Sequence, residues 1–550
     1  MNSLLYRPVS KESKGSWDAI VIGSGIGGMA CAASLAKFGK CVLILEQHFI
    51  PGGFGQTFSR KGHTWDVGVH CVGEMGPDDI PGRMFRWLTN GRLKWESLGP
   101  TYETFFFPGD FKIEFPDNLK DFKLNLKAAF PDDGKAIDEY FSIIRGFRMA
   151  AYRFLASRVL PRWTQDISSF FMPEHKFWRK TTKEVLDSLT FNEKLKSVLA
   201  GQWGYYGSTP SQSSFGLHAM VVNHFIRGGY YPAGGAASIA NGLLKTVSDA
   251  GGETLVRATV EEILIRGGRA VGVRLAGGQE FFAPKIISAA GARITAESLM
   301  PMEYKESKWA REILSTKQSP PHLCLYLGFE GDIEKAGVKR TNQWFFETWD
   351  LESSVWDLSG EMSECPALYL SFPSLKDPQH QKGPTHRHTA EVLAFVSWDS
   401  FSKWQKSSRG KRDLEYLAFK KTIEDCLVAQ LKKHIPQLME LVTHVELSTP
   451  LSTVYYTGAP QGAIYGLETT PKRFTNKSLR TRTPVKGLYL AANDVTVPGV
   501  VGALMGGLLA ASTVNCQVFI KLVGSVVVRL FHLGTCFIKG GKSKGPAVSS

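Results

Sequence analysis

The sequence predicts an α/β fold in which a parallel sheet is assembled from segments that lie far apart in the chain. Near the N-terminus, an apolar run at 18–22 precedes a glycine-rich turn, a helix-like segment and a second apolar run. This is the order of a β-α-β unit. Short apolar strands return near 254–291 and near 487–492, after long insertions. At 550 residues, the chain is also too long for one compact core.

The turn after the first strand carries Gly23, Gly25 and Gly28 at the spacing G-x-G-x-x-G. In such a turn the first glycine permits the tight bend and the second lets a pyrophosphate approach the backbone. The third lets the following helix pack closely on the strand. The pattern therefore predicts a phosphate-binding turn.

A helix is predicted over 26–38, followed by a second apolar strand at 41–45. That strand delivers Glu46, 18 residues after Gly28, to its carboxyl end. An acidic side chain there can accept hydrogen bonds from a ribose hydroxyl. Strand, glycines, helix, strand and acid together predict a Rossmann-type dinucleotide-binding unit, rather than an α/β unit with an incidental glycine turn.

The composition narrows the classes of partner. With 65 Lys and Arg against 51 Asp and Glu, the formal net charge is +14, which favours anionic partners. The basic residues are scattered and no nucleic-acid-binding module is recognisable, so no nucleic acid is expected. Phe (34) and Trp (13) are abundant and the C-terminal end is apolar and basic, so a membrane surface is the favoured partner.

Cysteine and histidine spacing predicts no metal site. The eight cysteines form no C-x-x-C pair, as expected for a reducing compartment. His380, His386 and His388 lie in a polar loop without a flanking acid or cysteine to complete a coordination set.

The N-terminal segment lacks an apolar core long enough for a secretory signal. We therefore expect an intracellular protein.

A second glycine pair, Gly52-Gly53, is expected to let the backbone approach a ligand. The next segment, 62–70, alternates in the manner of a strand and ends at His70. This histidine either faces a reacting centre or is a hydrogen-bonded structural residue, and the sequence leaves both open.

From 76 to 225 the pattern predicts helices rich in large aromatics, including 105–107 and 147–154. This segment is either a helical substructure with a solvated basic face or a lid that touches a bilayer. The basic residues interleaved with the aromatics are Arg145, Arg148, Arg153, Arg158, Arg162, Arg179 and Lys180.

The segment from 228 to 300 is predicted to return to the nucleotide-binding sheet. Glycines at 228–235 precede an amphipathic helix at 236–250. The strands expected after it are 254–256, 260–266, 270–275 and 285–291. The segment 300–470 is mixed, with strands near 323–329, 367–372 and 392–398 and a helix over 414–435.

The last informative block is an apolar strand at 487–492 that leads to Asp494 and then to a small-residue helix containing Gly502. Such a helix N-terminus suits a ring that becomes anionic on reduction. The uncharged stretch 500–520 is long enough to span a bilayer, but its small residues favour a buried core helix. The stretch 522–538 is the better candidate for a membrane-dipping helix.

Taken together, these blocks resemble the retinol saturase branch of the phytoene desaturase and carotenoid isomerase flavoproteins. Among the matching pieces are DAIVIGSGIGGMACAASLAKFGK, VLILEQH, GGFGQTF, GGYYPAGG and GLYLAANDVTVPGVVGALMGGLLAAS, in the right order from about 17 to 517. The chain departs from the animal members at Phe54-Gly55, which replaces cysteines, and at the missing N-terminal signal.

The resemblance implies an amine oxidase or phytoene desaturase-like architecture with FAD as cofactor. The implied FAD-binding domain is discontinuous, at 17–75, 228–300 and 480–515, with an inserted α+β substrate or lid domain at 76–227 and 301–479. Residues 516–550 would form a membrane-associating tail. The residues implied to bind FAD are Gly23, Gly25, Gly28, Glu46, Gly53, Val260, Asp494 and Gly502.

The implied activity is saturation of a double bond in an apolar retinoid-like or carotenoid-like polyene, by hydride transfer from reduced flavin. Isomerisation, desaturation and a non-catalytic prenyl-lipid carrier of the Rab escort type are the alternatives. NAD(P)H is a possible electron donor without a second binding motif, and the endoplasmic reticulum membrane is the expected location in a eukaryote. Candidate proton donors, chosen on position and residue type, are His70, Tyr230, Tyr465 and Glu468.

Overall fold

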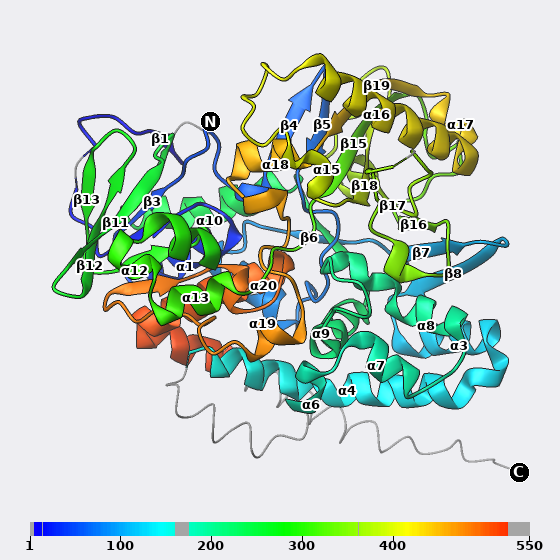
Figure 1. Ribbon diagram of the computed structural model, residues 1–550, viewed down its shortest axis with the longest axis horizontal. Helices are drawn as coiled ribbons and strands as arrows, with labels where there is room; N and C mark the ends of the chain where they lie inside the picture. Colours follow the sequence, from blue (N-terminus) through cyan, green and yellow to red (C-terminus); the bar gives the residue numbers. More distant parts are fainter. Residues whose placement is uncertain (1–4, 14, 160–174, 361, 526–550) are drawn as a thin grey trace, which may run out of the picture.

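A computed structural model describes residues 5–13, 15–159, 175–360 and 362–525. Figure 1 shows a nucleotide-type sheet with its helices on one side of the molecule and a larger, mostly antiparallel sheet on the other. The α/β fold class is confirmed. The division of the chain at the boundaries given above stays a prediction.

The first sheet has six parallel strands in the order β1-β10-β3-β2-β14-β20. Most of its strands are short apolar runs buried on both faces, the pattern of a parallel sheet between layers. The strands come from distant parts of the chain, as predicted. Their bounds are β1 Arg7–Pro8, β10 Glu253–Val256, β3 Val42–Leu45, β2 Ala19–Ile22, β14 Ile286–Ser288 and β20 Leu488–Leu490.

Three helices pack around this sheet: α1 (Ile26–Ala36), α10 (Ala237–Asp249) and α20 (Gly499–Val514). Glycines let α1 and α20 approach closely, because a Cβ added to Gly507 would lie 2.2 Å from the carbonyl oxygen of Gly27. The first part of the 500–520 stretch is thus a core helix, as expected from its small residues.

Not all of the predicted strands join this sheet. Of the three strands expected between 254 and 275, the first is β10, whereas β11 (Val260–Arg266) and β12 (Arg269–Leu275) pair antiparallel with β13 (Glu280–Phe282) in a separate sheet. The prediction of a simple return to the nucleotide sheet was wrong here. The Gly267-Gly268 turn, with positive φ at both residues, folds β12 back on β11 instead.

The larger sheet has seven strands in the order β19-β15-β18-β17-β16-β7-β8. Its outer face packs against α16 (Leu414–His434), with Ile423, Leu427 and Leu431 buried against the sheet. Its inner face is turned toward the region between the two sheets. The bounds are β19 Val442–Ser448, β15 His322–Glu330, β18 Arg387–Phe395, β17 Ala367–Ser371, β16 Asn342–Phe346, β7 Thr101–Phe107 and β8 Phe111–Pro116.

Two local predictions were wrong. Residues 105–107 lie in β7 rather than in a helix, because the TYETFFF run alternates between the two faces of the sheet and aromatic residues favour strands. The strand expected at 62–70 ends at Asp66, where β5 (His63–Asp66) completes a hairpin with β4 (Thr57–Arg60). Residues 67–70 form a loop, and His70 lies at its end.

The helical part of the chain begins with α2 (Ile80–Leu88) and contains the long α4 (Gly134–Ser157). A two-stranded antiparallel sheet is made by β6 (Trp95–Ser97) and β9 (Tyr230–Pro232), which lie far apart in the chain. The other helices of this part are α3 Leu119–Ala129, α6 His175–Arg179, α7 Thr182–Asp187, α8 Glu193–Ala200 and α9 Phe215–Phe225. Short helices elsewhere are α11 Ala292–Ile294, α12 Met302–Lys305, α13 Lys308–Leu314, α14 Pro373–Lys376, α15 Asp399–Ser402, α17 Pro436–Met439, α18 Pro450–Thr457 and α19 Pro471–Thr475.

The predicted membrane-dipping stretch, 522–538, and Arg162 of the basic series lie largely or wholly outside the described residues. Within the part of the chain that the structure describes, no helix has the length and apolar character needed to cross a bilayer.

Candidate active site

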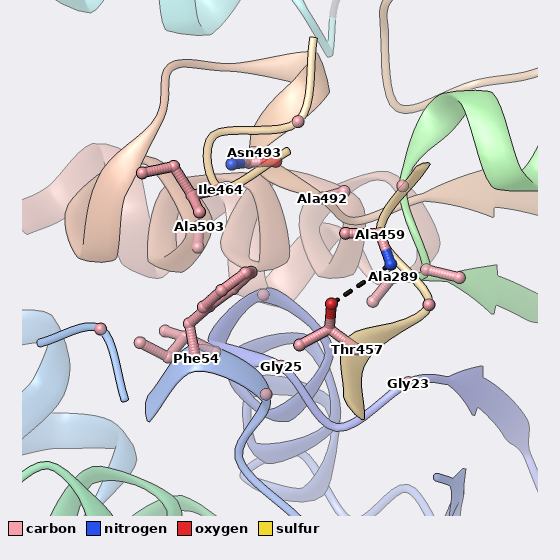
Figure 2. Close-up of a pocket in the computed structure, with 18 of the residues that line it drawn as sticks. Gly23, Gly25, Phe54, Ala289, Thr457, Ala459, Ile464, Ala492, Asn493 and Ala503 are labelled. Atoms are coloured by element: carbon pink, nitrogen blue, oxygen red, sulfur yellow. Dashed lines mark hydrogen bonds between the residues drawn. The ribbon is translucent and has the colours of Figure 1, made fainter. Parts of the chain in front are cut away.

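A cavity of about 380 Å³ lies where the carboxyl end of the six-stranded sheet meets the inner face of the larger sheet. In an open α/β sheet this edge is where ligands bind. Figure 2 shows small side chains around much of its wall, and the Phe54 side chain extending from the Gly53–Gly55 turn toward Ala503 of α20. The main lining segments are 22–27, 45–47, 52–56, 67–70, 289–294, 456–460, 463–466, 491–494 and 499–503.

The glycine turn shapes one wall of the cavity for a ligand. Gly25 caps the N-terminus of α1, and a Cβ added to it would meet no atom within 4 Å. Gly53 has a φ of +58° and its own added Cβ would lie 3.1 Å from the Cα of Gly25. The free N–H groups at the start of an 11-residue helix therefore face open space, which is the arrangement that binds a phosphate.

Glu46 is fixed beside this turn. Its Oε2 accepts hydrogen bonds from the Ser24 backbone N–H at 2.9 Å and from the Ser24 hydroxyl at 2.6 Å. Its Oε1 accepts from the backbone N–H of His48 at 2.8 Å. The carboxylate is 7% exposed and lines the cavity, so it is held in place to accept hydroxyl donors from a ligand.

The other predicted cofactor residues divide into two groups. Val260 and Asp494 line the cavity, and Asp494 Oδ2 accepts from the Ala292 N–H at 2.7 Å. Gly28 and Gly502 do not line it. An added Cβ would lie 2.1 Å from the Gly23 carbonyl oxygen at Gly28 and 1.7 Å from that of Val497 at Gly502, so these two glycines permit close backbone packing.

Two polar side chains of the cavity wall lack a hydrogen-bond partner within the described part of the chain. Gln318 Nε2 and His322 Nδ1 are buried without a hydrogen-bond partner among the described residues, and both side chains line the cavity. Buried polar atoms are normally paired, so these two atoms are available to a ligand. Together with the open helix N-terminus at Gly25 and the carboxylate of Glu46, they fit FAD.

His70 lines the cavity and is paired with a buried acid. Its Nδ1 lies 2.8 Å from Oε2 of Glu391 in β18, and the Glu391 Oε1 accepts the Asp66 backbone N–H at 2.7 Å. Burial lowers the pKa of His70 to about 4 and raises the pKa of Glu391 to about 8. Near neutral pH this pair is therefore uncharged and holds its exchangeable proton on or next to Glu391.

The other candidate proton donors are placed less favourably. Tyr465 lines the cavity, but its hydroxyl donates to the Gly204 carbonyl oxygen at 2.9 Å. Tyr230 and Glu468 do not line it. Tyr230 lies in β9 near Asp79, and burial together with that acid raises its pKa. His70 is therefore the candidate that best combines position and partner.

Several residues of this site were not predicted from the sequence, namely Ser24, Gln318, His322, Lys376 and Glu391. Glu391 is the one acid in the apolar run 389–396, and a lone acid in such a run was the signal that could have drawn attention to it. No group of three or more potential metal ligands occurs within the described ranges.

Comparison with known proteins places the chain in a family. The model of the flavin containing amine oxidoreductases matches residues 26–515. The chain therefore belongs to this family, and it is an FAD-dependent oxidoreductase, as predicted.

Among related sequences, the chain is 33% identical to the all-trans-retinol 13,14-reductase of Rattus norvegicus, over 93% of this chain and 88% of the relative. It is 30% identical to a Danio rerio protein named inactive all-trans-retinol 13,14-reductase, over 92% and 87% of the two chains. It is 27% identical to the chloroplastic prolycopene isomerase of Arabidopsis thaliana, over 91% and 83%. The predicted branch of the family is thereby confirmed.

Solved structures agree on the fold. Cyclohexylamine oxidase from Brevibacterium oxydans aligns with a TM-score of 0.60 over 92% of this chain and 100% of its own, at 16% identity. At this identity the likeness concerns the fold alone.

Proposed function

We propose that this protein saturates one double bond of a retinoid-like or carotenoid-like polyene, in the manner of an all-trans-retinol 13,14-reductase. The observation that carries the proposal is the position of His70, which lines the same cavity as Gly25, Gly53 and Glu46 and is paired behind the cavity wall with the buried Glu391. The rat relative named for this reaction, at 33% identity over nearly the whole chain, supports it.

In this proposal Gly25, Gly53 and Glu46 hold FAD, which supplies hydride when reduced. The protein then has to place the polyene against the cofactor, keep water out and supply a proton. Apolar side chains of the cavity wall, including Phe54, Leu393 and Ile464, exclude water and suit an apolar polyene. His70 holds the proton at the cavity, with Nδ1 engaged by Glu391 and Nε2 left for the substrate.

The test is the product mass. The holoprotein, with its flavin chemically reduced, is incubated with a panel of polyenes that includes all-trans-retinol, and each product is weighed. A gain of two hydrogens supports saturation. The absence of such a product from every polyene would contradict the proposal. This measurement matters because the Danio rerio relative named inactive is also 30% identical, so identity at this level does not decide activity.

Isomerisation of a carotenoid-like polyene is the second candidate, supported by the 27% identity to prolycopene isomerase. The same experiment separates the two reactions, because an isomerase returns a product of unchanged mass and altered geometry. A desaturase would instead return a product that has lost two hydrogens.

Two further parts of the proposal concern the surroundings of the enzyme. NAD(P)H is proposed as the electron donor. The test is to add NAD(P)H anaerobically to the holoprotein and to follow the bleaching of the flavin absorbance.

A membrane surface, that of the endoplasmic reticulum in a eukaryote, is proposed as the source of the apolar substrate. Removal of residues 519–550, most of the predicted 516–550 tail, should release the protein from sedimenting membranes while FAD stays bound. Unchanged sedimentation would exclude this tail as the anchor.

A further inference from the structure

A row of polar side chains crosses the buried inner face of the larger sheet. Glu391 of β18 lies opposite Ser371 of β17, and Asn342 of β16 lies opposite Glu103 of β7. Figure 1 shows these four strands side by side in that order. All four residues are 0% exposed. A sheet face packed on apolar neighbours does not need such residues, because burying polar groups costs free energy unless they are paired.

Lys376 of α14 connects this row to the cavity. Its Nζ donates to Ser371 Oγ at 2.8 Å, to the Asn342 side-chain oxygen, and to the His70 carbonyl oxygen at 3.0 Å. Lys376 is only 1% exposed. The row therefore reaches His70 twice, through the Lys376 ammonium at its backbone and through the Glu391 carboxyl at its ring.

If all four titratable groups of this cluster were ionised, three carboxylates (Asp66, Glu103 and Glu391) would face one ammonium group (Lys376), and the cluster would carry a net negative charge. Burial raises the pKa of Asp66 to about 7, of Glu103 to about 7 and of Glu391 to about 8, and it lowers the pKa of Lys376 to about 8. Such clusters of perturbed groups are typical of functional sites. The titratable groups that interact with the His70–Glu391 pair from neighbouring elements, directly or through Lys376, include Asp66, Cys71, Glu103, Tyr231, His322, Cys324, Tyr326, Tyr369 and Lys376.

We propose that Glu391 is a positioning residue that holds the His70 imidazole in one tautomer and supplies it with the proton that His70 delivers to the substrate. The proposal rests on the proposed function. In the step, the Nε2–H bond of His70 breaks and a C–H bond forms at one carbon of the double bond. The O–H bond of Glu391 breaks and an Nδ1–H bond forms, so the imidazole stays neutral.

The other carbon of the double bond would receive the hydride that reduced FAD supplies when it is bound, so the substrate gains two hydrogens and the two residues undergo no redox change. Glu391 is left as a carboxylate, which the nearby Lys376 ammonium stabilises. A solvent proton that enters the open cavity after product release restores the acid.

The alternative is that Glu391 is only a structural acceptor for the Asp66 N–H. The variant Glu391→Gln separates the two roles, because its amide oxygen can still accept that bond and its NH₂ can still donate to His70, but it holds no transferable proton. The matched control is Tyr326→Phe, since Tyr326 is the cross-strand partner of Glu391 in β15 and is 6% exposed.

The test is a double-mutant cycle on the FAD-loaded protein. The rate of saturated product formation from all-trans-retinol is measured in a single turnover for the wild type, E391Q, H70Q and the double variant. We expect E391Q to slow the wild type at least tenfold and the H70Q variant less than twofold, with Y326F within twofold of the wild type. Equal slowing by E391Q in both backgrounds would overturn the proposal.

A second readout does not depend on turnover. The ¹⁵N signals of labelled histidines report the tautomer and charge of His70, which is assigned by its absence in H70Q. Because the Gln amide donates to the same Nδ1, E391Q should keep the His70 tautomer but remove the pH dependence of the His70 signals that the ionisation of Glu391 causes in the wild type and in Y326F. An equal pH dependence of these signals in E391Q and in the wild type would overturn the proposal. If the wild type forms no saturated product, the proposed function fails, and these signals still decide whether Glu391 sets the protonation state of His70.

Discussion

The hydroxyl of Ser24 joins Glu46 to the second glycine pair. It donates to Glu46 Oε2 at 2.6 Å and accepts the Gly52 backbone N–H at 3.1 Å. The carboxylate at the end of one strand is thereby fixed relative to both glycine turns that border the cavity. A ligand that contacts all three therefore meets a preformed site.

The variant Ser24→Ala should weaken flavin retention without unfolding the protein. It removes one hydrogen bond to a charged group and leaves the Gly52 N–H without its partner, a loss of about 1–3 kcal/mol. If half of this loss appears in binding, the FAD dissociation constant should rise about two- to tenfold. The measurement is a titration of the apoprotein with FAD, followed by flavin fluorescence.

The matched control for this change is Ser34→Ala. Ser34 is equally buried, lies in the helix α1 that follows the Ser24 turn, and donates to the Ala30 carbonyl oxygen, away from the cavity. An equal loss of FAD affinity in both variants would show that the effect arises from the helix and not from the Glu46 anchor.

The second and third glycines of the pattern have different roles, ligand approach and helix packing, and a pair of variants separates these roles. A Cβ at Gly25 meets nothing and its φ of −61° suits alanine, so Gly25→Ala should fold normally but exclude the pyrophosphate. A Cβ at Gly28 would lie 2.1 Å from a backbone oxygen, so Gly28→Ala should destabilise the fold itself.

Melting curves and the flavin content of the purified proteins check this pair. We expect Gly25→Ala to melt within a few degrees of the wild-type apoprotein and to contain almost no FAD. Gly28→Ala should be recovered poorly or melt far lower. Full flavin content in Gly25→Ala would contradict the assignment of the Gly25 turn as the phosphate site.

The sequence was sufficient for the parts of this site that are encoded locally. Residues 19–46 form one continuous β-α-β unit, so the spacing of its residues already determines which of them can border the cavity. The same holds for Asp494, which lies four residues after the end of β20. Such short-range patterns carry their geometry in the order of residues.

The partners of His70 could not be predicted in the same way. Glu391 is 321 residues away in the chain, and only the pairing of β15 with β18 and the packing of that sheet on β5 bring it to the ring. Aromatic runs are also compatible with either a helix or a strand. The segment 105–107 suits a helix by its setting, but its alternation between two buried faces follows the register of β7 with β16.

Glu391 should make the protein less stable as the pH rises. The pKa of its carboxyl is raised from 4.5 to about 8 in the folded protein by burial, so the folded state binds more protons than the unfolded chain between these values. Its contribution to stability is therefore complete below pH 4.5 and is lost as the pH rises toward 8. Each pKa unit corresponds to about 1.4 kcal/mol at most.

The difference in melting temperature between the wild type and Glu391→Gln isolates this effect from other titrating groups. We expect the wild type to lose stability relative to the variant steadily from pH 5 to pH 8. The control is Glu297→Gln, because Glu297 is half-exposed in an ion pair with Arg293. A difference that is constant with pH would show that Glu391 is ionised in the folded protein.

Tyr465 tests whether a second group can supply the proton. Its hydroxyl donates to the Gly204 carbonyl oxygen at 2.9 Å, and burial raises its pKa well above the usual value. A hydroxyl with that partner and that pKa is a poor acid toward a substrate.

The variant Tyr465→Phe tests this. It should cost about 1 kcal/mol of folding free energy, because the hydrogen bond to Gly204 is lost. Product formation in a single turnover should stay within twofold of the wild type, whereas His70→Gln slows it strongly. A fall for Tyr465→Phe as large as that for His70→Gln would move the proton donor from the β5 loop to the 463–466 segment.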